Sequence, residues 1–467
     1  MSGARLILKN MLSLSVAEIA KQGLMVIFTI YVARVLSPEG FGIINFAKAF
    51  VMYFILVVGL GYDTYGTREI AKDKSTLHKN VNTIFTIRLL LSSIAYVVLI
   101  GIVFFLDKPD IVKIVLIIVG TQIFSNAFLL NWVYIGLERM EIVAIRQVAV
   151  SILNLIGVIL LVHHPDDTIM AVIITSASLA INTIWLIVYY IREFGVIKLD
   201  FDWVYFKQMT KSSLRLGLIF FIITIYNYLN INMLGFMKSN VETGIYSAAF
   251  SIMLFSLVPS SIFQNAFFPN FSRAEQREDR IKIMSKFSLL SYMFGSIIAV
   301  GLFTFADGIV IIFGNKYLDV LPVIRIVMIT VLIMYLNINF SSPLIAWKME
   351  SRVLYAIIAG GITNIIANIF LIPEYGAIGA GIGTILSETA VFIGLARTYY
   401  LTVRKFEFFK LLVLILLSIF SCGIGYLLNI YALNIFISAI ISFIIYFILI
   451  FAFKLISLNE LMGYLKR

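Results

Sequence analysis

Charged side chains inside long apolar stretches are the residues whose chemistry stands out in this sequence. Four cations and two carboxylates have this setting, namely Lys21, Lys48, Arg88, Arg325, Glu18 and Glu388. Each such cation costs roughly 2.5–3.5 kcal/mol at the centre of a membrane helix, so we expect these side chains to face a water-filled interior rather than lipid. Because cations outnumber carboxylates, the set predicts a cationic interior that attracts an anionic ligand.

The carboxylates suggest how ions could couple to the process. Glu18 and Lys21 are three residues apart, so they share one helix face. They form either a local structural ion pair or a group that binds and releases a proton. We assign ion coupling to Glu18 and to Glu388, which is predicted near mid-membrane.

The remaining cations are candidates for anion binding. Lys48 is predicted about 10 Å from the outer start of its helix and has no acidic residue within a turn. Arg88 is second, because a guanidinium can bind phosphate oxygens with two parallel hydrogen bonds. Arg88 and Arg325 have an alternative, since long basic side chains can extend toward the membrane surfaces.

A cluster of neutral polar residues occurs at Tyr226, Asn227 and Asn230. Spacings of three and four residues place Asn230 on one helix face with the other two. Amides and phenols both donate and accept hydrogen bonds, so they suit sugar hydroxyls. Polar contact between neighbouring helices is the alternative role.

The elements that position these residues are membrane-spanning helices. Hydrophobic residues are 61% of the chain and charged residues 13%, about half the charged fraction of soluble domains. Apolar stretches of about 20 residues, long enough to cross a bilayer, recur throughout. The sequence predicts an all-α integral membrane protein of about fourteen helices, at 10–35, 41–62, 83–106, 112–137, 141–163, 168–191, 214–237, 244–268, 286–313, 318–345, 353–372, 376–400, 410–429 and 433–456.

The basic residues predict the orientation of these helices. With the N-terminus inside, 27 of the 36 Lys and Arg residues lie in inner segments and 5 in outer ones. Such a bias marks the cytoplasmic side, so both termini are expected there. The net charge of +11 is explained in the same way and does not predict a nucleic-acid partner.

Motifs for enzymatic chemistry are absent from the sequence. There is no phosphate-binding GxxxxGK[ST] loop, and the three histidines and single Cys422 have no metal-binding spacing. The predicted outer loops are short, which argues against a membrane enzyme with an external catalytic loop. We therefore expect a transporter with no catalytic residues, metal or cofactor, driven by an ion gradient, the membrane potential, or substrate supply and removal.

An internal repeat divides the predicted helices. The segments Gly42–Ala47 and Gly244–Ala249 both open a helix after an acidic outer turn, about 200 residues apart. Helices 1–6 and 7–12 are therefore expected to form two six-helix bundles in the same orientation, as parallel repeats. We expect domains at 1–195 and 214–402, an amphipathic cytoplasmic linker at 196–213, and two appended helices with a cytoplasmic tail at 403–467.

The runs VARVLSPEGFGIINFAKAF…GLGYDTYGTREIAK and IYNYLNINMLGFMKSNVETGIYSAAFSI…FPNFSRA resemble the two halves of Wzx-type polysaccharide-biosynthesis flippases. These belong to the multidrug/oligosaccharidyl-lipid/polysaccharide exporter superfamily. The resemblance implies two bundles around a central cavity, alternating access, and an undecaprenyl-pyrophosphate-linked oligosaccharide as substrate. It also implies a bacterial cytoplasmic membrane, contact with membrane lipids, and a polysaccharide polymerase and chain-length regulator as partners.

The sequence departs from this family at one position and leaves two other functions open. Many relatives carry an acidic residue where this chain has Asn230, which puts a coupling carboxylate there in doubt. A multidrug or cation antiporter of the same superfamily is one alternative function, although its substrates would favour carboxylates over cations. A membrane polysaccharide polymerase or glycosyltransferase is the other.

Overall fold

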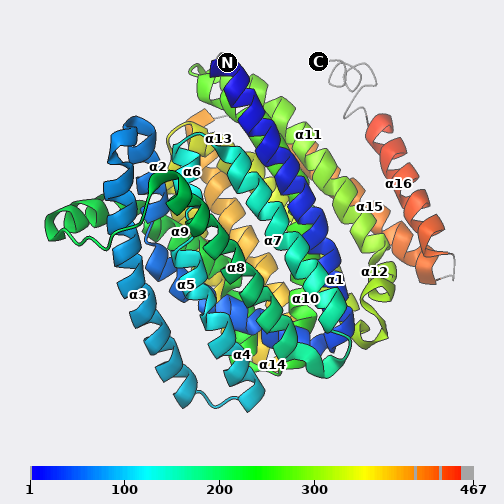
Figure 1. Cartoon of the computed structure of the whole chain (residues 1–467). Helices are drawn as coiled ribbons and strands as arrows, with labels where there is room; N and C mark the ends of the chain where they lie inside the picture. Colours follow the sequence, from blue (N-terminus) through cyan, green and yellow to red (C-terminus); the bar gives the residue numbers. More distant parts are fainter. Residues whose placement is uncertain (1–2, 404–407, 431–433, 454–467) are drawn as a thin grey trace. The chain divides into compact units, whose positions relative to one another are not determined.

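The computed structural model describes residues 3–403, 408–430 and 434–453, and within these ranges it contains helices and no strand (Figure 1). The chain forms two compact units, Met1–Gly244 and Ile245–Arg467. The predicted cytoplasmic tail, from residue 454 on, lies outside the described residues. The division into domains at 1–195 and 214–402 stays a prediction.

The N-terminal unit consists of nine α-helices and the start of a tenth. Their bounds are α1 Gly3–Gly59, α2 Tyr62–Lys72, α3 Leu77–Phe105, α4 Asp110–Gly120, α5 Gln122–Ala127, α6 Asn131–Gly136, α7 Met140–Leu161, α8 Thr168–Phe194, α9 Trp203–Met237 and α10 Asn240–Arg273. Two short 3-10 turns join them, η1 Lys74–Thr76 and η2 Pro165–Asp167.

A backbone kink divides α1 into two arms. Ser37 has φ 63° and ψ 173°, which is not helical, and Pro38 follows it. Proline lacks an amide hydrogen and clashes with the carbonyl four residues earlier, so it breaks the helical ladder. The helices predicted at 10–35 and 41–62 correspond to these two arms.

Just after the kink, Gly42 of α1 lies against Gly244 in the first turns of α10. A Cβ atom on Gly42 would lie 1.8 Å from the backbone oxygen of Asn240, and one on Gly244 would lie 1.8 Å from that of Pro38. Any side chain would force the backbones apart, so this crossing requires glycine on both helices. These are the glycines that open the two predicted repeat segments.

The C-terminal unit contains the rest of α10, six further α-helices and one 3-10 turn, η3. Their bounds are α11 Arg277–Thr304, α12 Ala306–Phe313, η3 Asn315–Tyr317, α13 Val320–Ala346, α14 Glu350–Val403, α15 Phe408–Ile430 and α16 Ile435–Ala452. A kink at Gly376, with φ 54° and ψ −127°, divides α14. Its arms correspond to the helices predicted at 353–372 and 376–400.

Among the described residues, twelve helical segments are long and apolar enough to cross a membrane. Two of them, of 42 and 54 residues, contain the kinks at Ser37 and Gly376. The protein is therefore an all-α, multi-pass membrane protein. The number fourteen is not confirmed, although the two kinked segments lie where the sequence predicts two helices each.

Several predicted helices have different ends in the structure. The helix predicted at 112–137 is interrupted twice, forming α4, α5 and α6. At the first interruption the Thr121 hydroxyl donates to the Ile118 carbonyl oxygen over 2.7 Å, a side-chain bond that competes with the backbone ladder. The helix predicted at 286–313 ends at Thr304 and is followed by the separate α12.

The linker predicted at 196–213 has two parts in the structure. Residues 195–202 are not helical and are attached to α3, because the backbone amide of Lys198 donates to Asn82 Oδ1 over 3.0 Å. The carboxylate of Asp202 then caps α9 by accepting from the amides of Val204 and Tyr205. Residues 203–213 of the predicted linker are thus the first turns of α9, and their cytoplasmic placement stays a prediction.

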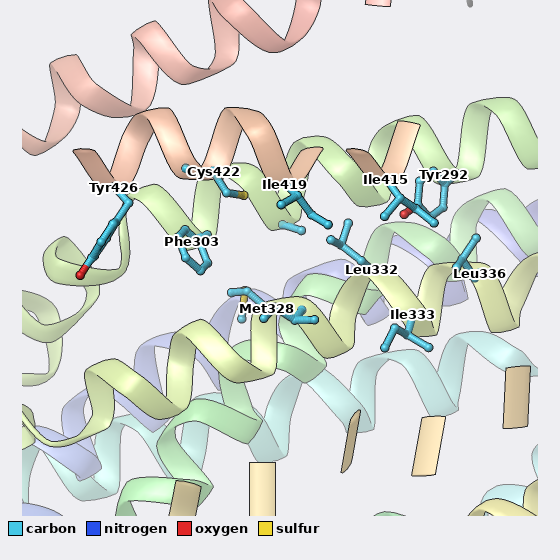
Figure 2. A pocket seen from close by; sticks show the side chains of 13 residues that line it. Tyr292, Phe303, Met328, Leu332, Ile333, Leu336, Ile415, Ile419, Cys422 and Tyr426 are labelled. Atoms are coloured by element: carbon cyan, nitrogen blue, oxygen red, sulfur yellow. The ribbon is translucent and has the colours of Figure 1, made fainter. Parts of the chain in front are cut away.

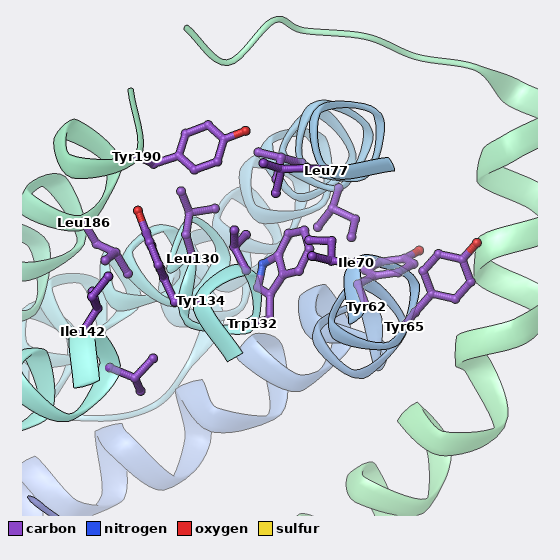
Figure 3. Close-up of a cluster of buried hydrophobic side chains, with 14 of the residues drawn as sticks. Tyr62, Tyr65, Ile70, Leu77, Leu130, Trp132, Tyr134, Ile142, Leu186 and Tyr190 are labelled. Atoms are coloured by element: carbon purple, nitrogen blue, oxygen red, sulfur yellow. The ribbon is translucent and has the colours of Figure 1, made fainter. Parts of the chain in front are cut away.

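A buried hydrophobic cluster holds α2, α3, α6, α7 and α8 together. Trp132 extends from α6 toward Ile70 and Tyr62 of α2 (Figure 3). Its indole ring occupies the space above Gly66, where an added Cβ would lie 2.3 Å from Trp132 Cζ3. This packing fixes α2 against α6 and so positions the polar residues of both helices described next.

Candidate substrate cavities

The N-terminal unit contains two neighbouring cavities that share Asn126 and Leu129 as lining residues. The Lys48 cavity has a volume of about 340 Å³ and is lined by α1, α5, α7 and α8. The Arg88 cavity has a volume of about 680 Å³ and is lined by α1, α2, α3, α5 and α6. Both volumes are in the range of small-molecule sites, roughly 300–1,000 Å³.

The Lys48 cavity contains two of the predicted cations. Lys48 lines it from the second arm of α1, with its Nζ 5.7 Å from the centre of the Phe28 ring. Lys21 lines it from the first arm and donates to both carboxylate oxygens of Glu18 over 3.0 Å. Gln22 donates to the same carboxylate over 2.9 Å. The structure therefore contains the local ion pair, which was one of the two sequence-based interpretations of Glu18 and Lys21.

Arg146 is a third cation of this cavity and was not among the predicted site residues. Arg146 lies in α7, is 6% exposed and lines the cavity. Its Nη1 donates to Asn182 Oδ1 over 3.0 Å, while its buried Nε finds no hydrogen-bond partner in the described part of the chain. Its position inside the predicted helix 141–163 was the signal that could have identified it.

The rest of the Lys48 cavity is largely polar. Amide and hydroxyl side chains line it, namely Gln122, Asn126, Gln147, Ser151, Asn154 and Thr175. The buried Oε1 of Gln147 and Oδ1 of Asn154 accept no hydrogen bond from the described residues. Such groups can be satisfied by water or by a polar ligand.

In the Arg88 cavity the principal cation is neutralised. Arg88 is 2% exposed, and its Nη1 lies 2.9 Å from Asp63 Oδ1. It also donates to the carbonyl oxygen of Ala127 over 3.3 Å. Arg88 thus pairs with a carboxylate of α2 and is buried. Asp63 was missed as a candidate, although it is the one acidic residue between positions 41 and 68.

The two cavities therefore differ in charge. In the Arg88 cavity, Arg88 pairs with Asp63, and Arg68 pairs with Glu69 over 3.0 Å. In the Lys48 cavity, neither Lys48 nor Arg146 forms a salt bridge with a described carboxylate, whereas Lys21 does. The surplus positive charge of this region lies in the Lys48 cavity.

The remaining predicted site residues lie elsewhere. In the C-terminal unit, Arg325 pairs with Asp307 over 3.2 Å and lies over the Tyr426 ring. Glu388 is 4% exposed and accepts from the Asn337 amide over 2.6 Å.

On α9, Asn230 is buried, Tyr226 is partly buried and Asn227 is exposed. These three residues line neither the Lys48 cavity nor the Arg88 cavity.

A third cavity lies within the C-terminal unit and is almost wholly apolar. It has a volume of about 480 Å³ and is formed by α11, α13 and α15. Figure 2 shows Ile415, Ile419 and Cys422 extending from α15 toward Met328 and Leu332 of α13. We call it the α13–α15 cavity.

Comparison with known proteins decides the family. Residues 7–275 match the model of a family described as polysaccharide biosynthesis protein. The chain belongs to this family. A protein of Shigella dysenteriae described as an O-antigen transporter is 25% identical over 386 residues, covering 77% of this chain and 92% of that protein. The resemblance found in the sequence is thereby confirmed.

Solved structures share the fold. The lipid II flippase MurJ in an inward closed conformation has a TM-score of 0.69 at 14% identity, covering 94% of this chain and 98% of that one. An inward-facing multidrug resistance MATE family transporter of the MOP superfamily has a TM-score of 0.67 at 14% identity, covering 83% and 96%. At this identity the likeness establishes the fold and not the substrate.

Proposed function

We propose that this protein is a flippase that moves lipid-linked oligosaccharide units across a membrane for polysaccharide biosynthesis. Family membership supports this role, and so do relatives described as O-antigen transporters and the fold shared with a lipid II flippase. We further propose undecaprenyl pyrophosphate as the carrier lipid and alternating access as the mechanism. The site would bind the unit at the cytoplasmic leaflet and release it at the outer leaflet.

One observation carries the substrate assignment, namely the surplus positive charge of the Lys48 cavity. Lys48 and Arg146 face a polar cavity without a carboxylate partner among the described residues. A cation in a low-dielectric site attracts an anion strongly, and the head of a lipid-linked oligosaccharide carries a pyrophosphate. We propose that Lys48 and Arg146, with Lys21 beside them, bind that pyrophosphate. Arg146 thus replaces Arg88 as the second candidate, after Lys48, for binding the pyrophosphate.

The other predicted substrate residues have weaker support. Arg325 has a carboxylate partner in Asp307, and Tyr226, Asn227 and Asn230 lie outside both N-terminal cavities. They stay predictions. The same surplus of positive charge speaks against a cation antiporter, because a cationic substrate would be repelled.

The lipid chain of the substrate requires an apolar surface as well. The α13–α15 cavity is such a surface, and α15 and α16 correspond to the two helices predicted to be appended to the twelve-helix core. Burial of a prenyl chain there would be driven by the hydrophobic effect. We propose that this cavity holds part of the prenyl chain.

Energy coupling, location and partners belong to the same proposal. We propose ion coupling through Glu18, whose carboxylate is held by Lys21 and Gln22, and through the buried Glu388. The protein would reside in the bacterial cytoplasmic membrane with both termini cytoplasmic. A polysaccharide polymerase and a chain-length regulator would act on the exported unit.

The experiment that tests the proposal separates charge removal from charge retention at Lys48. In a flippase-null strain, Lys48→Ala is expected to abolish surface polysaccharide, and Lys48→Arg is expected to keep a measurable part of it at matched membrane levels. Normal export by Lys48→Ala would refute pyrophosphate binding at this residue. A wild-type chain that restores no polysaccharide in any lipid-linked oligosaccharide system would refute the function itself.

A further inference from the structure

We propose that the two N-terminal cavities divide the head of the substrate between them. The Lys48 cavity holds the pyrophosphate, and the Arg88 cavity holds an uncharged sugar next to it. This inference rests on the proposed function and adds to it a sugar site and a preference for neutral over acidic sugars near the phosphate.

The charges that line the Arg88 cavity are paired and do not favour an anion. Arg88 lies 2.9 Å from Asp63, and Arg68 lies 3.0 Å from Glu69, so each cation lining the Arg88 cavity has a carboxylate partner. The Asp63 side chain is 60% exposed, so it presents negative charge to an incoming ligand while Arg88 is buried behind it. An anionic group would be repelled by Asp63, whereas a neutral polar group would not.

The Arg88 cavity is lined by both hydrogen-bond donors and hydrogen-bond acceptors. Asp63 supplies acceptor oxygens, and Thr64 and Asn131 line the same cavity with a hydroxyl and an amide. Among the described residues, the buried Nε of Arg88 and Oδ1 of Asn131 have no hydrogen-bond partner. A sugar hydroxyl both donates and accepts, so a wall that mixes acceptors and donors suits pairs of neighbouring hydroxyls.

The Arg88 cavity is also lined by apolar residues. Ile55, Ala127, Leu129 and Ile135 add apolar side chains to the polar lining of the Arg88 cavity. A sugar ring has C–H faces as well as hydroxyl edges, and binding sites for small molecules combine an apolar lining with a few polar groups in this way. A phosphate has no such apolar face.

The Arg88 cavity adjoins the Lys48 cavity. Asn126 and Leu129 line both cavities, so the cavities lie side by side. In a glycosyl pyrophosphate the first sugar is covalently bonded to the phosphate, so the two groups require adjoining sites. The Arg88 cavity is twice as large, about 680 Å³ against about 340 Å³, which fits a sugar beside a smaller phosphate group.

The experiment measures the ratio of two exported units. A flippase-null strain is supplied with either of two oligosaccharides on the same lipid pyrophosphate, one entirely neutral and one with a hexuronic acid near the phosphate. Wild type is expected to export the neutral unit better. Lys48→Gln and Arg146→Gln are expected to lower both exports by the same factor, because both units carry the same pyrophosphate.

Removing the Asp63 charge should instead change the ratio. Asp63→Asn exposes the positive charge of Arg88, so export of the acidic unit relative to the neutral one should rise by roughly tenfold, equivalent to about 1.4 kcal/mol. The double variant Asp63→Asn with Arg88→Gln removes both charges and leaves no buried cation unpaired. Its export of the acidic unit should therefore nearly equal its export of the neutral unit. Asn131→Leu should weaken export of the neutral unit without a change of charge.

Membrane levels of each variant, measured by an affinity tag, normalise the exports and identify a variant that does not fold. The double variant decides the question if Asp63→Asn alone fails to reach the membrane. A double variant with the wild-type ratio would overturn the sugar site, and so would a wild type that prefers the acidic unit. Export of neither unit by wild type would overturn the proposed function instead.

Discussion

Replacing Asp63 with Asn removes the carboxylate 2.9 Å from Nη1 of Arg88, whose side chain is 2% exposed. The buried guanidinium would keep the Ala127 carbonyl oxygen, 3.3 Å away, as its remaining described partner. Removing one partner of a fully buried ion pair costs about 3–5 kcal/mol. Asp63 is 60% exposed, so water already screens the pair, and we expect about half of that cost, about 2 kcal/mol.

Removing Arg88 instead of Asp63 should lower the free energy of unfolding by a smaller amount. Arg88→Met removes the buried charge itself and leaves Asp63 in contact with water, so we expect a loss of about 1 kcal/mol. Asp63→Asn combined with Arg88→Met should be no less stable than Arg88→Met alone, because a buried pair replaced as a whole is often energetically neutral. The order of stability is therefore a prediction that depends on which partner is buried.

Thermal unfolding in detergent, followed by tryptophan fluorescence, measures this order. At roughly 2–4 °C per kcal/mol for a unit of this size, Asp63→Asn should lower Tm by roughly 4–8 °C. Arg68→Gln is the matched control, because it breaks the neighbouring pair with Glu69, in which the Arg68 side chain is 51% exposed. It should shift Tm by no more than about 2 °C. The reasoning fails if Asp63→Asn shifts Tm no more than this control, or if Arg88→Met is the more damaging change.

Three further outcomes test the remaining proposals. Gly423→Phe should fill the α13–α15 cavity, because an added Cβ there meets no atom within 4 Å, and should lower export. Gly101→Phe is the control, because that position is equally unobstructed but lies away from the cavity, and it should not lower export. Equal export by the two variants would exclude the cavity as a prenyl site. Glu18→Gln in vesicles should reduce transport driven by an imposed pH gradient, and unchanged gradient dependence would remove Glu18 from coupling. A cysteine at the exposed Ser75, in a Cys422→Ala background, should resist an impermeant thiol reagent added outside intact cells, and labelling would contradict the predicted topology.

The sequence was sufficient for the class of protein and much of its helical organisation. Hydrocarbon-length apolar stretches are a local property of the chain, so the all-helical membrane fold could be predicted without knowledge of contacts. The same holds for Glu18 and Lys21, whose pairing requires only a spacing of three residues on one helix. The arms of the kinked helix α1 were predicted separately because Ser37 and Pro38 interrupt the apolar pattern.

What the tertiary structure decided was which charges remain unpaired. Arg88 and Asp63 are 25 positions apart on different helices, so only packing of α2 against α3 brings them together and neutralises the Arg88 cavity. In the sequence, Arg146 is a cation near the start of a predicted helix, and only the packing of α7 against α8 shows that it is buried beside Asn182. Lys48 and Arg146 share a cavity because their helices pack against each other, and an electrostatic site depends on that proximity rather than on order in the chain.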